Sequence, residues 1–319
     1  MTASHPAAAH APAHLAEIRG ATSISVCIPA RDEEATVGAV VAAIRRDLVD
    51  GVALVDEILV MDDGSTDATA AVAAAAGATV VAVAGVLPSL GARAGKGEAL
   101  WTSLAASHGD LVVWVDADLE GFTARTVSRL VAPLLLDPSV ALVKGFYRPD
   151  GAGGAESGSG RVTELVARPV ISSFHPELAG IVQPLGGECA GRRDVLEAVP
   201  FAGGYGVDLG LLIDVGRREG PDAVAQVGLG ERRHRHHPLD RLGVQAAEVL
   251  DVALRRAGVR SESQPVLRRP DRPDARVDTS DRPPLGSLRG TVPGLPPRPG
   301  SPPAEVAATL ALTRDGRAS

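Results

Sequence analysis

Short β-rich runs alternate along this chain with segments whose apolar residues repeat at helical spacing. The strand-like runs cover residues 23–28, 57–61, 79–83, 111–115 and 140–143, and helical spacing is clearest over residues 35–48 and 66–76. Strands that alternate with helices are typical of parallel sheets, in which each helix crosses over one face of the sheet. The pattern therefore predicts an α/β fold with a mostly parallel central sheet flanked by helices on both faces.

Composition sets the expected limits of the folded region. The chain has 319 residues, 45% of them hydrophobic, which is enough apolar material for a large core. Eleven of the 24 prolines follow Gly258, and no aromatic residue does. We therefore expect a flexible segment over residues 1–20, one folded domain over residues 21–258 and a proline-rich, largely disordered tail over residues 259–319.

Charge and cysteine content narrow the classes of partner and location. The formal net charge is −7, whereas proteins that bind phosphate backbones are usually basic, so we expect no nucleic-acid partner. The two cysteines, Cys27 and Cys189, cannot make a disulfide framework, which favours a reducing cytoplasm. Residues 68–92 are uncharged over a length that spans a bilayer, but Gly77 and Pro88 interrupt them, so we expect no membrane span.

Acidic residues gather directly after three of the predicted strands. The clusters are residues 29–34 (PARDEE), 62–67 (DDGSTD) and 116–118 (DAD). In an open α/β sheet the ligand crevice lies outside the carboxyl ends of the strands, so the three clusters are expected to converge on one edge. Helix capping by Asp32 or Thr66 is the alternative interpretation of the first two clusters, because Asp and Thr are preferred at helix starts.

The third cluster points to a metal. Asp116 and Asp118 follow a run that is typical of a buried strand, and carboxylates crowded at a strand end repel each other unless a cation joins them. Mg²⁺ or Mn²⁺ in phosphate chemistry is usually held by one or two carboxylates and completed by diphosphate oxygens. The cluster therefore favours a nucleotide-diphosphate substrate.

Lys96 lies between two glycines, where the backbone can approach a phosphate closely. A solvated loop lysine is the alternative interpretation. The surrounding sequence is not a P-loop, since Gly97 stands where Ser or Thr should follow the lysine, and no Gly-rich dinucleotide-binding motif follows the first strand. P-loop NTPases and adenine-dinucleotide enzymes are therefore excluded.

The second half of the chain carries candidate anion-binding segments. Residues 151–160 are rich in Gly and Ser and form a candidate lid, and Arg161 and Thr163 at the following helix start favour a bound anion. Residues 230–237 (GERRHRHH) are dense in donors, and His234 and His236 would share one face of an extended segment. One imidazole is a candidate metal ligand and the arginines candidate anion binders, with a solvated charged loop as the alternative.

The motifs taken together resemble a known family. PARDEE, DDGSTD, GKGEALW, VDADL, LVKGFYR, GRVTELVARP, QPLGGE, GYGVDLGLLID and LGERRHRHHPL occur in the order seen in the actinobacterial glucosyl-3-phosphoglycerate synthases, which are retaining glycosyltransferases of the GT-A fold. The similarity covers roughly residues 22–256. It implies a donor half over about residues 21–150 and an acceptor half over about residues 151–258.

The resemblance also implies roles for individual residues. The implied donor-binding residues are Pro29, Ala30, Arg31, Asp32, Glu33, Asp63, Lys96, Asp116, Ala117, Tyr205, Gly206 and Val207. The implied acceptor-binding residues are Gly160, Arg161, Val162, Thr163 and His236. Asp118 and His234 would bind Mg²⁺ or Mn²⁺, and Asp208 and Arg232 would be the catalytic residues.

The reaction implied is transfer of glucose from NDP-glucose, UDP-glucose by preference, to the 2-hydroxyl of 3-phosphoglycerate by a homodimer. Four residues depart from the family pattern, in which Ser is expected at Ala117, Ser is common at Asp63, and Glu and Asn are usual at Asp208 and His236. Two alternatives stay open: a related transferase for mannose or a polyprenyl-phosphate acceptor, and a relic that binds NDP-sugar without turnover.

Overall fold

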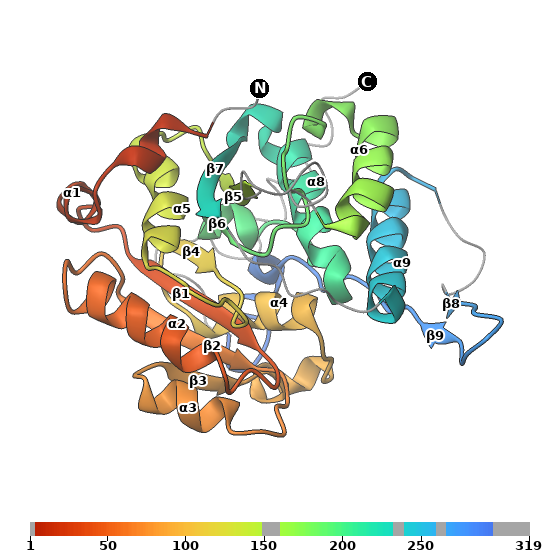
Figure 1. Ribbon diagram of the computed structural model, residues 1–319, viewed down its shortest axis with the longest axis horizontal. Helices are drawn as coiled ribbons and strands as arrows, with labels where there is room; N and C mark the ends of the chain where they lie inside the picture. The colour runs from red at the N-terminus through yellow and green to blue at the C-terminus, as the bar shows by residue number, and fades with distance from the viewer. Residues whose placement is uncertain (1–3, 149–159, 232–238, 260–265, 296–319) are drawn as a thin grey trace.

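The computed structural model describes residues 4–148, 160–231, 239–259 and 266–295. Its centre is a seven-stranded sheet with the strand order β3-β2-β1-β4-β6-β5-β7 (Figure 1). The strands are β1 (Ile24–Ala30), β2 (Glu57–Asp62), β3 (Thr79–Ala82), β4 (Leu111–Trp114), β5 (Leu142–Arg148), β6 (Cys189–Arg192) and β7 (Val224–Glu231). Strand β6 runs antiparallel to β4 and β5, and the other pairs are parallel. The predicted α/β fold with a mostly parallel sheet is confirmed.

Helices cover both faces of this sheet. The α-helices of the described residues are α1 (Pro12–Ile18), α2 (Val37–Ile44), α3 (Thr69–Ala75), α4 (Lys96–Ala106), α5 (Arg125–Leu136), α6 (Arg168–Phe174), α7 (Arg193–Leu196), α8 (Val207–Glu219) and α9 (Leu239–Arg256). Alternate residues of β1 point to opposite faces, so Val26 packs in the core under α1, α2, α3 and α5, and Cys27 in the core under α4 and α6 to α9.

The predicted elements differ from the observed ones mainly at their ends. The helix expected over residues 35–48 consists of α2 followed by a π-helical turn at Arg45–Val49. The strand expected over residues 140–143 begins two residues before β5 and covers only its first two residues. The uncharged window over residues 68–92 contains α3, β3 and short 3-10 turns. Within the described residues no helix has the length and hydropathy needed to span a membrane.

The expectation that residues 1–20 are flexible is wrong for their described part. Helix α1 packs its Leu15 into the core, where the side chain is fully buried beside residues of α5 such as Leu130 and Val131. Its Pro12 at the first helical turn has no amide N–H that would need a partner there. The buried Ala7 and a hydrogen bond from the amide of His5 to the carbonyl of Gln226, at 2.8 Å, also hold this segment against the core.

The expectation of a disordered tail after residue 258 is wrong for residues 266–295. The strands β8 (Val266–Leu267) and β9 (Ala275–Arg276) form a hairpin that extends away from the body of the molecule, after which the chain returns to it (Figure 1). Leu285 and Leu295 are then buried in the same core as Trp101. The tail orders because a preformed surface accepts its isolated leucines, while prolines reduce the entropy lost on ordering.

Two single substitutions in the tail test this packing. Leu285→Ala should destabilise the fold by about 2–5 kcal/mol, because the side chain is 0% exposed and its loss leaves a cavity. The melting temperature should fall by about 4 °C or more. Val266→Ala, at a position that is 46% exposed, should change it by less than about 2 °C. Equal melting temperatures for the two variants would contradict the packing of the tail on the core.

Candidate functional site

The carboxyl ends of β1, β2 and β4 bring the three acidic clusters to one edge of the sheet. Pro29 and Ala30 at the end of β1 pair in register with the last two residues of β2. On the other side of β1, Cys27 pairs with Trp114, the last residue of β4. The DDGSTD and DAD clusters therefore flank the PARDEE cluster, as the strand pattern predicts.

Asp32 and Glu33 join the loops that follow β1 and β2 through hydrogen bonds that involve side chains. Asp32 has a left-handed backbone with a φ of 57°, and its Oδ1 accepts hydrogen bonds from the amide (2.7 Å) and hydroxyl (3.1 Å) of Thr66. The amide of Glu33 donates to Oγ1 of Thr69 at 2.8 Å. These bonds tie the loops after β1 and β2 together. The N-cap residues are Thr36 for α2 and Ala68 for α3, and neither makes a side-chain cap hydrogen bond, so the capping interpretation of Asp32 and Thr66 is wrong.

Asp63 connects the end of β2 to the loop before Lys96. Its Oδ2 accepts a hydrogen bond from the amide of Gly95 at 2.7 Å, and Nη1 of Arg31 lies 3.8 Å away. Burial raises the pKa of Asp63, while the Gly95 hydrogen bond and the Arg31 charge act in the opposite direction. Gly95 has a φ of 100°, a conformation that favours glycine, so the GKG sequence suits this turn.

Lys96 lies between two carboxylates. Its Nζ is 3.4 Å from Oδ1 of Asp116 and 3.0 Å from Oδ2 of Asp208, and its side chain is 13% exposed. Burial alone would lower the pKa of Lys96, but the charges of Asp116 and Asp208 outweigh it, so the pKa lies well above its usual value. The alternative of a solvated loop lysine is therefore wrong.

Asp208 presents a buried oxygen without a hydrogen bond. The residue lies in the first turn of α8 and is 3% exposed. In the described part of the chain, its Oδ1 has no hydrogen-bond partner, although Oδ2 contacts Lys96. Buried hydrogen-bond acceptors nearly always have a donor. Oδ1 of Asp208 is therefore suited to accept a hydrogen bond from a hydroxyl group of a ligand.

Two further residues of this site were missed by the sequence analysis. Lys144 of β5 is buried, donates from Nζ to the carbonyl of Gly186 at 2.5 Å, and lies 4.0 Å from Oδ1 of Asp208. Gly187 leaves no room for a side chain, because an added Cβ would lie 2.4 Å from both oxygens of Asp116. A lysine within a strand-like run and a Gly-Gly pair were the signals that could have revealed them.

The GYGV segment brings Asp208 beside α4. The amide of Tyr205 donates to Oε2 of Glu248 on α9 at 2.8 Å, and the Tyr205 side chain is exposed. Gly206 packs against α9, where an added Cβ would lie 2.4 Å from Val252. Val207 is buried in the core, so its side chain is remote from solvent, and its main chain is the part available at the site.

The described acceptor residues lie at a helix start. Gly160 precedes the first turn and Arg161 is exposed, whereas Val162 and Thr163 are buried. The amide of Glu164 donates to the carbonyl of Gly160 at 3.1 Å, which begins the helical segment. The assignments of Arg232, His234 and His236 fall outside the described residues.

The carboxylates at this edge of the sheet suit a metal ion that also binds the substrate. Of the two implied ligands, Asp118 is described. It lies in the loop after β4, and Ala117 before it packs its methyl group into the core under α5. Among the described residues no group of three His, Cys, Asp or Glu side chains is placed to hold a metal ion by itself. Mg²⁺ and Mn²⁺ sites completed by diphosphate oxygens need only one or two protein carboxylates, so these residues fit such a cation.

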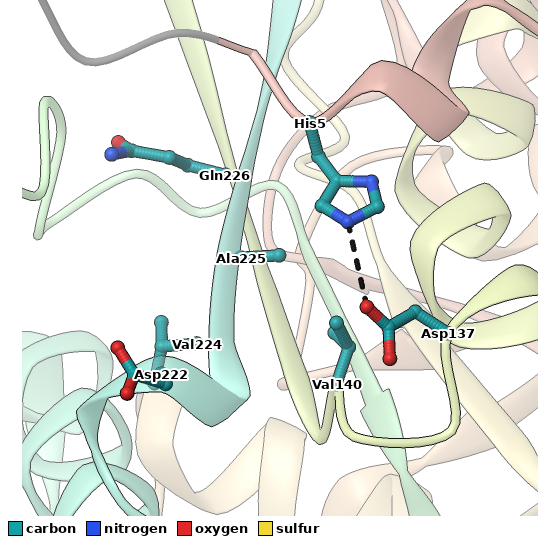
Figure 2. A pocket seen from close by; sticks show the side chains of 7 residues that line it. All are labelled: His5, Asp137, Val140, Asp222, Val224, Ala225 and Gln226. Carbon is teal, nitrogen blue, oxygen red and sulfur yellow. Dashed lines mark ion pairs between the residues drawn. The ribbon is translucent and has the colours of Figure 1, made fainter.

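A shallow pocket of about 260 Å³ lies elsewhere, at the amino ends of β5 and β7 (Figure 2). His5 and Asp137 approach each other there, with Nε2 and Oδ2 3.9 Å apart, and Asp222 lines the same pocket. Because β5 and β7 run parallel to each other and begin here, this pocket is at the opposite edge of the sheet from the acidic clusters. It contains none of the residues implied for donor or acceptor.

The fold and the acidic edge are those of a sugar-nucleotide transferase. A family model described as Glycosyl transferase family 2 matches residues 25–199, and the chain belongs to this family. The match ends before α8, so Asp208 lies beyond it.

Within that family, the chain belongs with the glucosyl-3-phosphoglycerate synthases. It is 48% identical over 292 residues to the synthase of Mycolicibacterium paratuberculosis, covering 87% of this chain and 88% of the relative. A crystal structure of the Mycobacterium tuberculosis synthase matches with a TM-score of 0.82 at 44% identity, over 90% of this chain and 99% of that chain. Another, in complex with Mn²⁺, UDP-glucose and phosphoglyceric acid, matches with a TM-score of 0.81 at 45% identity, over 90% and 98%.

A glycine substitution tests the close approach at the centre of the site. In Gly187→Ala the new methyl group would lie 2.4 Å from the Asp116 oxygens and 2.6 Å from Nζ of Lys96, so the ion pair must move. We expect a loss of about 1–3 kcal/mol, seen as a lower melting temperature. Gly180→Ala is the control, because nothing lies within 4 Å of its added Cβ, and it should leave the melting temperature unchanged. A stable Gly187→Ala protein would contradict the geometry described here.

Proposed function

We propose that this chain transfers glucose from UDP-glucose to the 2-hydroxyl of 3-phosphoglycerate and retains the anomeric configuration. The observation that carries the proposal is the Lys96 cation between Asp116 and Asp208, at the ligand-binding edge of a family 2 glycosyltransferase. Similar solved structures hold Mn²⁺ and UDP-glucose with phosphoglyceric acid, or UDP and Mn²⁺ with glucosyl-3-phosphoglycerate. These complexes contain the two sides of the proposed reaction.

The donor is proposed to lie across the carboxyl ends of β1, β2 and β4. Residues 29–33 and Asp63 would line the uridine pocket, where Asp63 and Arg31 already approach each other. Lys96 begins α4, so its ammonium group and the helix start both favour the anionic diphosphate. Tyr205 to Asp208 would surround the glucose, and Oδ1 of Asp208, which accepts no hydrogen bond within the described residues, would accept one from a sugar hydroxyl.

A divalent cation completes the donor site in this proposal. Asp118, together with His234, would hold Mg²⁺ or Mn²⁺. When bound, such a cation supplies positive charge that stabilises a departing diphosphate. Arg232 would add a second positive charge on the same group.

The reaction exchanges one bond at the anomeric carbon for another. The bond from this carbon to the diphosphate oxygen breaks, and a bond to the 2-hydroxyl oxygen of the acceptor forms. A diphosphate oxygen on the same face of the sugar accepts the hydroxyl proton, which is consistent with retention. Asp208 orients the sugar by hydrogen bonding, and its ion pair with Lys96 fixes the position of both side chains.

The acceptor is proposed to bind at the helix start that follows residue 159. Arg161 and Thr163, with the backbone of Gly160 and Val162, would bind the carboxylate or phosphate of 3-phosphoglycerate, assisted by His236. An exposed arginine at a helix start suits a small dianion.

Assembly and location complete the proposal. We propose a homodimer on family similarity alone. We propose a cytoplasmic location because Cys27 and Cys189 are both free thiols, which suits a reducing compartment.

The direct experiment is transfer with defined substrates. The full chain is incubated with Mn²⁺, UDP-glucose and 3-phosphoglycerate, and glucosyl-3-phosphoglycerate is measured by mass spectrometry, with the anomeric configuration assigned by NMR. Parallel reactions contain ADP-glucose, GDP-mannose or a polyprenyl phosphate. Product from GDP-mannose or from the lipid acceptor alone would favour the related transferase, whereas UDP binding without any product would favour a non-catalytic relic.

The metal assignment predicts the effect of removing the cation or Asp118. Excess EDTA and Asp118→Ala should each reduce turnover at least about 100-fold, because both remove the charge that stabilises the leaving diphosphate. Asp222→Ala, at an acid in the pocket on the opposite edge, is the matched control and should retain native turnover. Full activity in EDTA would remove the metal from the mechanism.

Asp208 separates a catalytic contact from simple donor binding. Asp208→Ala should lower kcat about 100-fold, while the Kd for UDP measured by calorimetry changes only a few-fold, because UDP lacks the glucose that Asp208 orients. Asp208→Glu should keep or exceed native turnover, since it restores the residue usual in the family. If the Ala variant loses UDP affinity as strongly as it loses turnover, Asp208 acts on the nucleotide through Lys96 and not on the sugar.

A further inference from the structure

Arg282, from the C-terminal segment, lies behind the donor site and contacts several elements there. It is 5% exposed, and its Nε and Nη2 donate to Oε2 and Oε1 of Glu98, both at 2.7 Å. Its Nη1 donates to the carbonyl of Leu90 at 2.8 Å and its Nη2 to that of Gly91 at 2.6 Å. The guanidinium carbon also lies 5.1 Å from the ring centre of Trp101.

Each of these partners belongs to the structure that presents Lys96. Glu98 lies in the first turn of α4, which Lys96 begins. The carbonyls of Leu90 and Gly91 start the loop that ends at Gly95, where Asp63 accepts the backbone hydrogen bond. The tail therefore holds the beginning of this loop and the first turn of α4, while the acidic cluster after β2 holds its end.

The same segment also supports the loop that leads to Asp208. The backbone of Arg282 pairs with that of Phe201 through two hydrogen bonds, of 3.0 Å and 2.7 Å. Gly203 packs against the tail so closely that an added Cβ would lie 2.7 Å from the carbonyl of Asp278. On the other side of the loop, an added Cβ on Gly97 would lie 2.0 Å from the carbonyl of Ala202. The loop over residues 201–204 is thus packed between α4 and the tail.

We propose that Arg282 is a positioning residue for the donor: it acts through Glu98 and the loop over residues 90–95 to hold Lys96 against the diphosphate. The inference rests on the proposed function of this site. A guanidinium group presents a planar set of donors that contacts the Glu98 carboxylate and two carbonyls at once, which an ammonium group cannot reproduce. The residue lies beyond the segment that the family 2 model matches, which ends at residue 199.

Arg289 provides a matched control within the same tail. Its Nε and Nη2 donate to Oε2 and Oε1 of Glu197, both at 2.7 Å, and Glu197 is as buried as Glu98, at 5% exposed. Glu197 directly follows α7, away from the loop that presents Lys96. Glu197 also lies 3.5 Å from Nη1 of Arg193, so it keeps a second cation when Arg289 is replaced. Replacement of Arg289 therefore removes a buried charged pair of the tail without removing a contact to the first turn of α4.

The experiment compares Arg282→Lys with Arg289→Lys in the full chain. For each variant, kcat and the KM for each substrate are measured, the Kd for UDP with Mn²⁺ is measured by calorimetry, and the melting temperature is recorded. Arg282→Lys should raise both the KM for UDP-glucose and the Kd for UDP about ten-fold, and leave the KM for the acceptor within about two-fold. Arg289→Lys should lower the melting temperature and leave all three constants within about two-fold.

Glu98→Gln keeps the test decisive if Arg282→Lys does not fold. This substitution removes the carboxylate charge that pairs with Arg282, and it should also raise the Kd for UDP about ten-fold. Unchanged UDP affinity in both variants, or an equal loss in Arg289→Lys, overturns the positioning role while the native enzyme still transfers glucose. Failure of the native chain both to bind UDP and to transfer glucose instead overturns the proposed function, and the inference that rests on it.

Discussion

The site depends on one arrangement of charge: a lysine held between two carboxylates at the edge of a mostly apolar core. Nζ of Lys96 is 3.0 Å from Asp208, which is 3% exposed. Removing such groups from water costs free energy that only mutual pairing offsets, so the start of α4, the start of α8 and the end of β4 must meet at one point. Many features of the surrounding chain follow from this requirement.

The close approach of these elements explains the glycines around the site. Gly97 lies against the carbonyl of Ala202, and Gly187 lies against the carboxylate of Asp116, so neither position has room for a Cβ. Both glycines occur in motifs that the family resemblance uses, GKGEALW and QPLGGE. These motifs are specific to the family because their glycines lie where the backbone contacts a carbonyl group or a charged side chain. Acidic residues after strands, by contrast, are common to many α/β proteins.

Local sequence patterns predicted most strands of the sheet. They did not predict the order of the terminal segments, because that order depends on contacts with residues far away in the sequence. The run over residues 111–115 reads as a buried strand because every residue in it is apolar, and β4 forms there. By contrast, the antiparallel β6 (Cys189–Arg192) consists of Cys, Ala, Gly and Arg, with no β-branched or aromatic residue to indicate a strand. The lysine between glycines indicated an anion site, but the carboxylate that pairs with it comes from Asp208, far along the chain. The order of the tail likewise depends on a surface that its own sequence does not contain.

The long sequence separation between Arg282 and Glu98 bears on how the molecule is made. Glu98 is synthesised 184 residues before the arginine that pairs with it. While the chain emerges from a ribosome, the sheet and α4 can form, but the Glu98 carboxylate must stay hydrated until the segment that carries Arg282 has been synthesised. The Arg282–Glu98 pair can therefore form only late in synthesis. The long loop that it closes predicts slow formation of the native contacts. An incomplete translation product would carry every strand of the sheet and yet lack the arginine that secures the start of α4.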